Sequence, residues 1–125
     1  MKVSELKYER ITIEQVKQEF NEILSAIKNA KSADEVLRVR ERYLEVYKDF
    51  ITAYGLSYMR YTINTVDEFY LKEKEYYDEV TPLIQNYQVE YSKAMLESPY
   101  RNDLEQKLSP LLFRSYEIAE KAMSP

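Results

Sequence analysis

The sequence predicts an all-α fold, and three observations support that prediction. The 125 residues include one glycine, Gly55, although sheets joined by tight turns need several residues that tolerate positive φ angles. Apolar residues recur at steps of three and four along most of the chain, which is typical of helices buried on one face. Capping boxes mark helix starts. We expect a helical hairpin, a long helix kinked by a proline and two shorter helices, forming one domain over residues 1–125.

The first two expected helices form an antiparallel hairpin. Thr12 and Gln15 make a capping box ahead of an apolar stripe of about five turns. Ser32 and Glu35 make a second box, and we expect the helix behind it to end at Gly55, where a residue in the left-handed region would stop it. The link between the two helices is short, so they should lie side by side.

The stretch 56–64 is ambiguous. It is rich in aromatic and β-branched residues, which favours a short extended link, but helices flank it, and one or two further helical turns are the alternative. Arg60 and Asp67 are candidates for an ion pair that braces this link, because a guanidinium fork suits a carboxylate. Solvation of both side chains at the surface is the other interpretation.

The third expected helix begins with a capping box of Thr65 and Glu68 and runs to Glu97. Pro82 falls inside it, and a proline either kinks a continuous helix or opens a new one. Because the apolar stripe continues in register past Pro82, we expect the kink.

Two serine–proline pairs open the remaining helices. Ser98-Pro99 and Ser109-Pro110 each place a capping hydroxyl before a proline at the first helical position. Ser124-Pro125 repeats the pair at the end of the chain, which predicts that a further helix begins there.

Composition argues against several kinds of site. The chain has no histidine and no cysteine, so it lacks the imidazole base, the nucleophilic thiol and the usual zinc ligands, and we expect neither catalytic nor metal-binding residues nor a cofactor in it. A net charge of −4 disfavours a nucleic-acid partner. The longest apolar run, 111–113, is far short of the ~20 residues that span a bilayer, so we expect no membrane partner. No secretory signal is visible and no disulfides are present, which fits a cytoplasmic protein.

Acidic residues gather between Asp67 and Glu79 and suggest a weak calcium or magnesium site. Lys72 and Lys74 are interleaved with them, and mixed charge of this kind is typical of a solvated helix face. We therefore favour the structural interpretation.

Thirteen tyrosines are the other unusual feature. Several follow the spacing of a helical core, where each ring is buried and each hydroxyl needs a partner. They form either a core with wet edges or the wall of a groove that contacts an extended peptide. The candidate residues for such a channel or docking surface are Tyr58, Tyr61, Tyr70, Tyr87 and Tyr91.

A scattered pattern of residues resembles a known family. It comprises Arg60-Tyr61-Thr62-Ile63-Asn64-Thr65, Asp67, Phe69-Tyr70, Glu73, Tyr77-Asp78-Glu79, Pro82, Ser98-Pro99-Tyr100-Arg101, Leu104-Glu105 and Leu112-Phe113. From about Tyr8 to Pro125 the chain resembles the N-terminal region of oligoendopeptidase F-type zinc metallopeptidases, which are relatives of thimet oligopeptidase. In that family an H-E-x-x-H helix and a downstream glutamate bind zinc, and the glutamate inside the motif is the general base. These elements lie far C-terminal to the matched region, so no residue of this chain aligns with them.

The resemblance implies a helical lobe that walls a deep channel and so limits substrates to short unfolded peptides. Family members are several times longer, which implies that this chain is a fragment, a truncated gene product or a split domain. Its partners would be the missing C-terminal catalytic domain with its zinc and the oligopeptide substrate, and the isolated chain should self-associate through an exposed apolar face. The alternative is a stand-alone helical interaction module with a tyrosine-lined groove.

Overall fold

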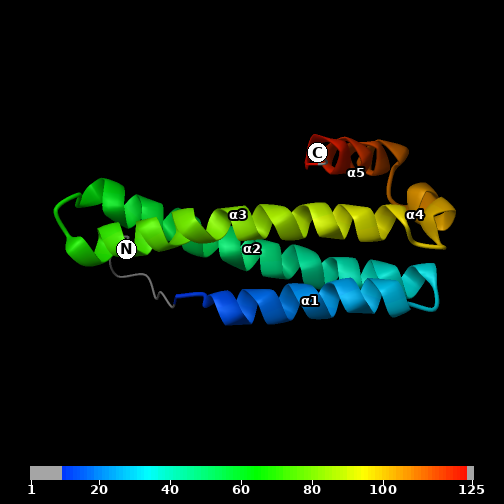
Figure 1. Cartoon of the computed structure of the whole chain (residues 1–125), viewed down its shortest axis with the longest axis horizontal. Coiled ribbons are helices and arrows are strands. Elements are labelled where there is room, and N and C mark those ends of the chain that lie inside the picture. Colours follow the sequence, from blue (N-terminus) through cyan, green and yellow to red (C-terminus); the bar gives the residue numbers. More distant parts are fainter. Residues whose placement is uncertain (1–9, 124–125) are drawn as a thin grey trace.

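The computed structural model describes residues 10–123, in which five α-helices follow one another and no strand occurs (Figure 1). The helices are α1 (Ile13–Asn29), α2 (Ala33–Ile63), α3 (Glu68–Leu96), α4 (Arg101–Lys107) and α5 (Pro110–Met123). The all-α prediction is therefore confirmed. The prediction of a helix start at Ser124-Pro125 lies outside the described residues.

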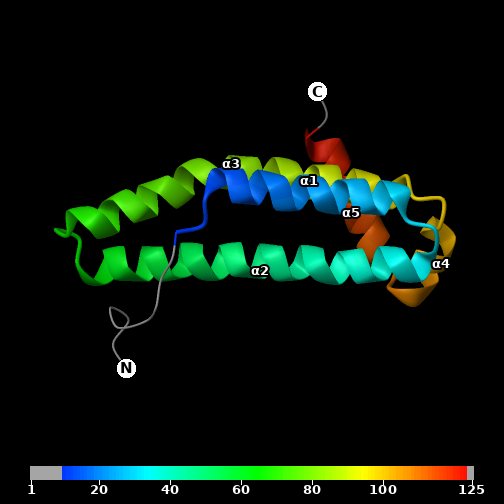
Figure 2. The same cartoon turned by 90° about the horizontal axis from the view of Figure 1, so that it is seen from below.

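The long helices α2 and α3 lie side by side and form the centre of the molecule. α1 returns along one side of this pair, as expected for the helical hairpin, and α5 packs on α3 on the opposite side (Figures 1 and 2). Both outer helices are shorter than the central pair. The end at which α2 turns into α3 therefore projects beyond them as a two-helix arm (Figure 2).

Two of the three predicted capping boxes begin helices where expected. The Thr12 hydroxyl accepts a hydrogen bond from the amide of Gln15 at 3.2 Å, and the Ser32 hydroxyl accepts one from the amide of Glu35 at 3.1 Å. The Glu35 carboxylate in turn accepts from the amide of Lys31 at 2.8 Å. These bonds satisfy amide groups that the first helical turn leaves without partners.

The extended link expected at 56–64 is wrong, because α2 continues without interruption to Ile63. Gly55 does not end a helix: it lies in the interior of α2, and its φ angle is not positive. Ser57 and Arg60, three residues apart, are both buried, so this stretch packs as a helix despite its local preference for an extended conformation. Tertiary burial outweighs residue propensities that amount to less than about 1 kcal/mol each.

α3 begins two residues later than the sequence suggested. Thr65 does not cap it. The N-cap is Asp67, whose carboxylate accepts from the amide of Tyr70 at 3.0 Å. Since a carboxylate complements the positive end of the helix dipole, Asp67 suits this position better than a hydroxyl does.

Pro82 lies inside α3, and the helix continues on both sides of it, so the prediction of one kinked helix is confirmed. The N-terminal part of α3 runs at an angle to the remainder, and the axis does not reverse (Figure 2). The neighbouring Thr81 hydroxyl donates to the Tyr77 carbonyl at 2.8 Å, a local bond that often accompanies a bend.

The two serine–proline pairs behave differently. Pro110 is the first residue of α5, and the Ser109 hydroxyl accepts from the amide of Leu111 at 3.1 Å, as predicted. At the other pair, Ser98-Pro99, the prediction is wrong. α4 begins only at Arg101, because the Ser98 hydroxyl accepts from the amide of Tyr100 at 3.1 Å and closes a turn ahead of the helix.

Aromatic rings fill much of the core where α2, α3 and α5 meet. The rings of Tyr43 and Tyr91 stack with their centres 3.7 Å apart and their planes parallel to within 1°. Tyr116 from α5 meets Tyr91 edge to face at 5.9 Å, and Phe113 meets Tyr116 at 5.3 Å. The Tyr91–Tyr116 contact joins α5 to α3, and the Tyr43–Tyr91 stack joins α3 to α2.

Candidate docking groove

A groove of about 590 Å³ runs between α2 and α5 with α3 as its floor, and we call it the α2–α5 groove. It is lined by Arg40, Tyr43, Leu44 and Tyr47 from α2, Gln85, Gln88, Val89, Tyr91 and Ser92 from α3, and Leu112, Ser115, Tyr116, Ala119 and Ala122 from α5. It forms because α5 packs mainly on α3 and leaves the side of α2 open. Its lining is mostly apolar, and it contains no acidic residue.

The floor of the groove is neutral at physiological pH. Burial, reinforced by the neighbouring Tyr47 and Tyr116 side chains, raises the pKa of Tyr43 well above its usual range. Burial and the adjacent Tyr116 hydroxyl do the same for the pKa of Tyr91. Since these phenols do not ionise, they act only as hydrogen-bonding groups on an aromatic surface.

Arg40 contributes the one positive charge of the groove lining. Among the described residues no carboxylate lies within ion-pair distance of Arg40, and its Nε atom is buried without a hydrogen-bond partner. The hydroxyl of Tyr91, whose side chain is 3% exposed, is likewise buried, and within residues 10–123 it forms no hydrogen bond of normal geometry, although the Tyr116 hydroxyl lies close to it. Buried polar groups of this kind cost stability unless something pairs with them.

Exposed apolar side chains also lie along α2 and α5, the two helices that wall the groove. Leu44, Ile51 and Tyr58 follow one another at intervals of seven along α2, and Leu111 and Ile118 do so on α5. These five side chains are between 42% and 77% exposed. A spacing of seven keeps them on one side of each helix, next to residues that line the groove. The groove therefore lies inside a wider apolar surface.

Beyond the end of α5, toward the arm, polar contacts join α2 to α3. The Tyr54 hydroxyl donates to Asp78 of α3 at 2.7 Å, and Lys74 pairs with Asp78 at 2.9 Å. The Lys74 ammonium also lies 5.5 Å from the centre of the Tyr61 ring. Lys74 first, and then Tyr54, holds the pKa of the Asp78 carboxyl below its usual range.

A buried carboxylate anchors the segment before α1 to the arm. The Arg10 guanidinium donates two hydrogen bonds to the buried Glu73, one of them from Nε at 3.1 Å. The Ile11 amide donates to the Tyr77 hydroxyl at 3.1 Å, and the Tyr76 hydroxyl donates to the Ile11 carbonyl at 2.7 Å. Two adjacent tyrosines thus hold both backbone groups of one residue.

Three of the five tyrosines predicted for a docking surface lie on one side of the molecule. Tyr91 forms part of the groove floor, Tyr58 is exposed on α2 in the arm, and Tyr61 is half-buried beneath Lys74. Tyr87 lies elsewhere, since its ring stacks on Phe20 of α1 at 5.0 Å. The structure therefore divides the predicted set between two faces.

The remaining predicted residues lie in the arm. The Arg60 guanidinium lies 5.9 Å from the centre of the Tyr70 ring, and both line a small internal space together with Glu73. Asp67 caps α3 as described above. The ion pair between Arg60 and Asp67 stays a prediction.

Arg40, Leu44 and Ile51 are not among the residues predicted for a docking surface, although they lie along the mainly apolar stripe of α2. The signal was present, because that stripe also contains Tyr43, Tyr47 and Phe50 and is too wide for one buried helix face. Such a stripe predicts that α2 has apolar neighbours on more than one side.

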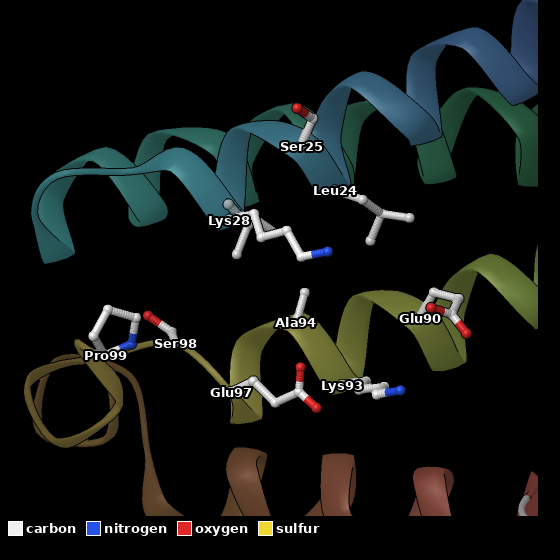
Figure 3. Close-up of a pocket in the computed structure, with 10 residues that line it drawn as sticks. Leu24, Ser25, Lys28, Glu90, Lys93, Ala94, Glu97, Ser98 and Pro99 are labelled. Carbon is white, nitrogen blue, oxygen red and sulfur yellow. The ribbon is translucent and has the colours of Figure 1, made fainter.

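A second hollow, of about 560 Å³, lies between α1 and α3 near their ends (Figure 3). Leu24 and Lys28 of α1 point toward α3, and Ala94 points back toward them (Figure 3). Its exposed charges are of both signs, and its buried hydroxyl, Ser98, already accepts from Tyr100. This hollow has less to offer a ligand than the α2–α5 groove.

Within residues 10–123, no group of three or more acidic side chains gathers in a way that would hold a metal ion. Glu73 and Asp78 of the predicted acidic stretch are engaged with Arg10 and Lys74. No helix in this part of the chain combines the length and the apolar character that crossing a bilayer requires.

Comparisons with known proteins agree on one family. The chain matches the peptidase M3 N-terminal domain over residues 3–123. A crystal structure assigned as an oligoendopeptidase F is 36% identical, with a TM-score of 0.91 over 100% of this chain and 22% of that chain. PZ peptidase A with an inhibitor is 36% identical, with a TM-score of 0.90 over 99% of this chain and 22% of that chain. A protein from Bacillus anthracis str. Ames, also assigned as an oligoendopeptidase F, is 34% identical, with a TM-score of 0.89 over 97% of this chain and 22% of that chain. No curated protein matches. The chain thus spans 22% of the length of the solved structures it resembles.

Proposed function

Because the chain belongs to the peptidase M3 N-terminal domain family, we propose that it is the non-catalytic lobe of a zinc-dependent, oligoendopeptidase F-type peptidase that cleaves short peptides. The observation that carries this proposal is the asymmetry of the structural match. The whole chain superposes on 22% of a chain assigned as an oligoendopeptidase F. The catalytic residues and the C-terminal catalytic domain then belong to the remaining part.

The residues of this chain do not fit a zinc site. The sequence has no histidine and no cysteine and therefore no H-E-x-x-H motif. We assign zinc to the remainder of the enzyme and derive no catalytic step from residues 1–125. The contribution of this lobe is shape: a helical wall that determines which peptides reach the catalytic centre.

We propose that the peptide-facing part of this wall is the side of the arm that carries Tyr58 and Tyr61. Tyr58 is half-exposed, and Tyr61 lies beside the linked pair Lys74 and Asp78. Aromatic faces contact peptide side chains of many kinds, while phenol hydroxyls and charged groups pair with the peptide backbone and termini. Such a surface holds extended peptides with little sequence preference.

A chimera tests the proposal. This chain replaces the matching 22% of the oligoendopeptidase F-type structure that is 36% identical to it, and hydrolysis of quenched fluorescent peptides of different lengths is measured with zinc. We expect zinc-dependent cleavage, and we expect Tyr58→Ala with Tyr61→Ala to raise KM several-fold with little change in kcat. The exposed pair Lys17→Ala with Lys48→Ala, outside the proposed wall, is the matched control.

A second experiment uses the isolated chain. With micromolar zinc and the same peptides, it should show no turnover, because it lacks the ligands that activate water on zinc. Chelator-sensitive turnover that survives repurification would contradict the assignment of catalysis to the remaining part. If the chimera folds and the Tyr58→Ala, Tyr61→Ala double variant has unaltered KM and kcat, the proposal that these tyrosines face the peptide is contradicted.

The alternative, a stand-alone helical interaction module, is favoured by one observation, the α2–α5 groove. A chimera that folds but cleaves no peptide, together with an isolated chain that remains a sharp monomer, would support this alternative.

A further inference from the structure

The positive charge of the α2–α5 groove is not balanced by a negative charge in its lining. Arg40 has no carboxylate partner among the described residues, and the groove lining contains no acidic side chain. The Tyr91 hydroxyl in the floor is buried and makes no hydrogen bond of normal geometry within residues 10–123. A fully solvated arginine does not destabilise a protein when it has no partner. The Nε of Arg40 is buried, so a carboxylate that accepts a charge-assisted hydrogen bond from this guanidinium would stabilise the protein.

The walls of the groove suit a helix. On the α5 side Ser115, Ala119 and Ala122 are small, so another helix can approach at the 8–10 Å typical of packed helices. On the α2 side Leu44 and Ile51 are exposed and lie seven residues apart. Apolar residues repeat at this spacing along helices that pack against one another. A helix lying along the groove would cover apolar side chains on both rims at once.

We propose that the α2–α5 groove is the docking site of an amphipathic helix from the part of the peptidase that lies outside these 125 residues, and that this helix places a carboxylate on Arg40. This inference rests on the proposed function, because only the longer relatives supply such a segment: the chain covers 22% of their length. An occupant with a lone acidic residue beside an apolar stripe matches the groove in charge and in apolarity. The groove is then an internal seam between lobes, and the peptide-facing side of the arm lies beyond its end along α2.

The experiment exploits the absence of cysteine from the chain, which makes single-cysteine labelling clean. Ser115→Cys on the groove wall and Ser25→Cys on α1 are both exposed serines in the isolated chain. Each is placed in the isolated chain and in the peptidase chimera described above, with the chimera's other cysteines replaced. The rate of maleimide labelling is compared at chain concentrations low enough to keep both proteins monomeric. We expect labelling of Ser115→Cys to slow at least tenfold in the chimera and that of Ser25→Cys to change less than twofold. Equal rates for Ser115→Cys in the two proteins would overturn the proposal.

The charge is tested with Arg40→Met, Arg40→Lys and the neighbouring exposed control Arg38→Met in the chimera. We expect Arg40→Met to restore several-fold faster labelling at Ser115→Cys, while Arg40→Lys and Arg38→Met leave it slow. Unchanged protection in Arg40→Met would refute the carboxylate.

A photo-reactive phenylalanine in place of Leu44 identifies what covers the groove. We expect an intramolecular cross-link to a helix that carries an aspartate or glutamate beside apolar residues. A cross-link between two chains, or only to added peptide, overturns the proposal. Peptide hydrolysis by the same chimera is measured separately: hydrolysis with an unprotected groove refutes the docking alone, whereas a folded chimera without hydrolysis counts against the proposed function.

Discussion

Replacing Gly55 with alanine should stabilise the protein. Gly55 lies in the interior of the 31-residue helix α2, and a Cβ atom built on it meets nothing within 4 Å. Its φ angle is not positive, so alanine fits without strain. Glycine in a helix interior costs about 0.5–1 kcal/mol relative to alanine, mainly because its unfolded chain is more flexible.

The expected size follows from the length of the chain. An unfolding entropy of about 2.1 cal/mol/K per residue amounts to roughly 0.26 kcal/mol/K for 125 residues, so Gly55→Ala should raise Tm by about 2–4 °C. Thermal melting followed by circular dichroism, with urea unfolding as a second measure, checks the prediction. Lys48→Gly, at an exposed position in the same helix, should lower stability by a similar amount. A loss of stability in Gly55→Ala would refute the reasoning, because it is the result expected if α2 ended at Gly55 in a left-handed conformation.

Three further predictions concern the tyrosines and the exposed surface. Tyr91→Phe should leave the free energy of unfolding unchanged or raise it by up to about 1 kcal/mol, because the buried Tyr91 hydroxyl makes no hydrogen bond of normal geometry in the described chain. Tyr77→Phe should lower it by about 1 kcal/mol, because the Ile11 amide loses its acceptor. Urea unfolding compares the two variants, and equal losses would contradict the distinction. Because the pKa values of Tyr43 and Tyr91 are raised, the folded state keeps protons that the unfolded state releases above pH about 10. The stability present below that pH should therefore fall as the pH rises further. Tyrosinate absorbance should show that these phenols ionise only when the protein unfolds, and their ionisation in the folded protein would be the contrary result. The isolated chain should self-associate at tens of micromolar through its exposed apolar surface, as measured by sedimentation velocity, and Ile118→Glu should weaken this association; a sharp monomer at every concentration would argue against it.

Local sequence signals predicted the secondary structure well wherever one side chain decides a helix start. Thr12, Ser32 and Ser109 cap helices through bonds to amides two or three residues ahead, so neighbours in sequence suffice. The same reasoning failed at Thr65 and Ser98. Asp67 caps α3 in place of Thr65 by accepting from the Tyr70 amide, and the Ser98 hydroxyl accepts from the Tyr100 amide in a turn ahead of α4. Two local solutions of similar energy cannot be ranked from the pattern alone.

The candidate groove and the predicted tyrosine surface share one residue. The excess of tyrosines predicted either a core or a groove wall, and Tyr91 is buried in the core and also lines the groove. Tyr87, four residues earlier on the same helix, faces α1 instead. Leu44 and Ile51 belong to the apolar stripe of α2 but are exposed. Which side of a broad apolar stripe is covered depends on the helices that pack there, and periodicity does not reveal them.

The sequence by itself determined the helical class, most helix starts, the continuation of α3 through Pro82 and the absence of the side chains that zinc chemistry requires. Only the tertiary structure decided that α2 runs on to Ile63 and that α5 packs on α3 and leaves α2 open. It also decided that Arg40 lies in the resulting groove with no carboxylate partner among residues 10–123. The physical reason is one of range. Capping bonds and helical periodicity arise between residues a few positions apart, whereas the pairing of helices depends on the summed packing of side chains distant in sequence, such as Tyr43, Tyr91 and Tyr116.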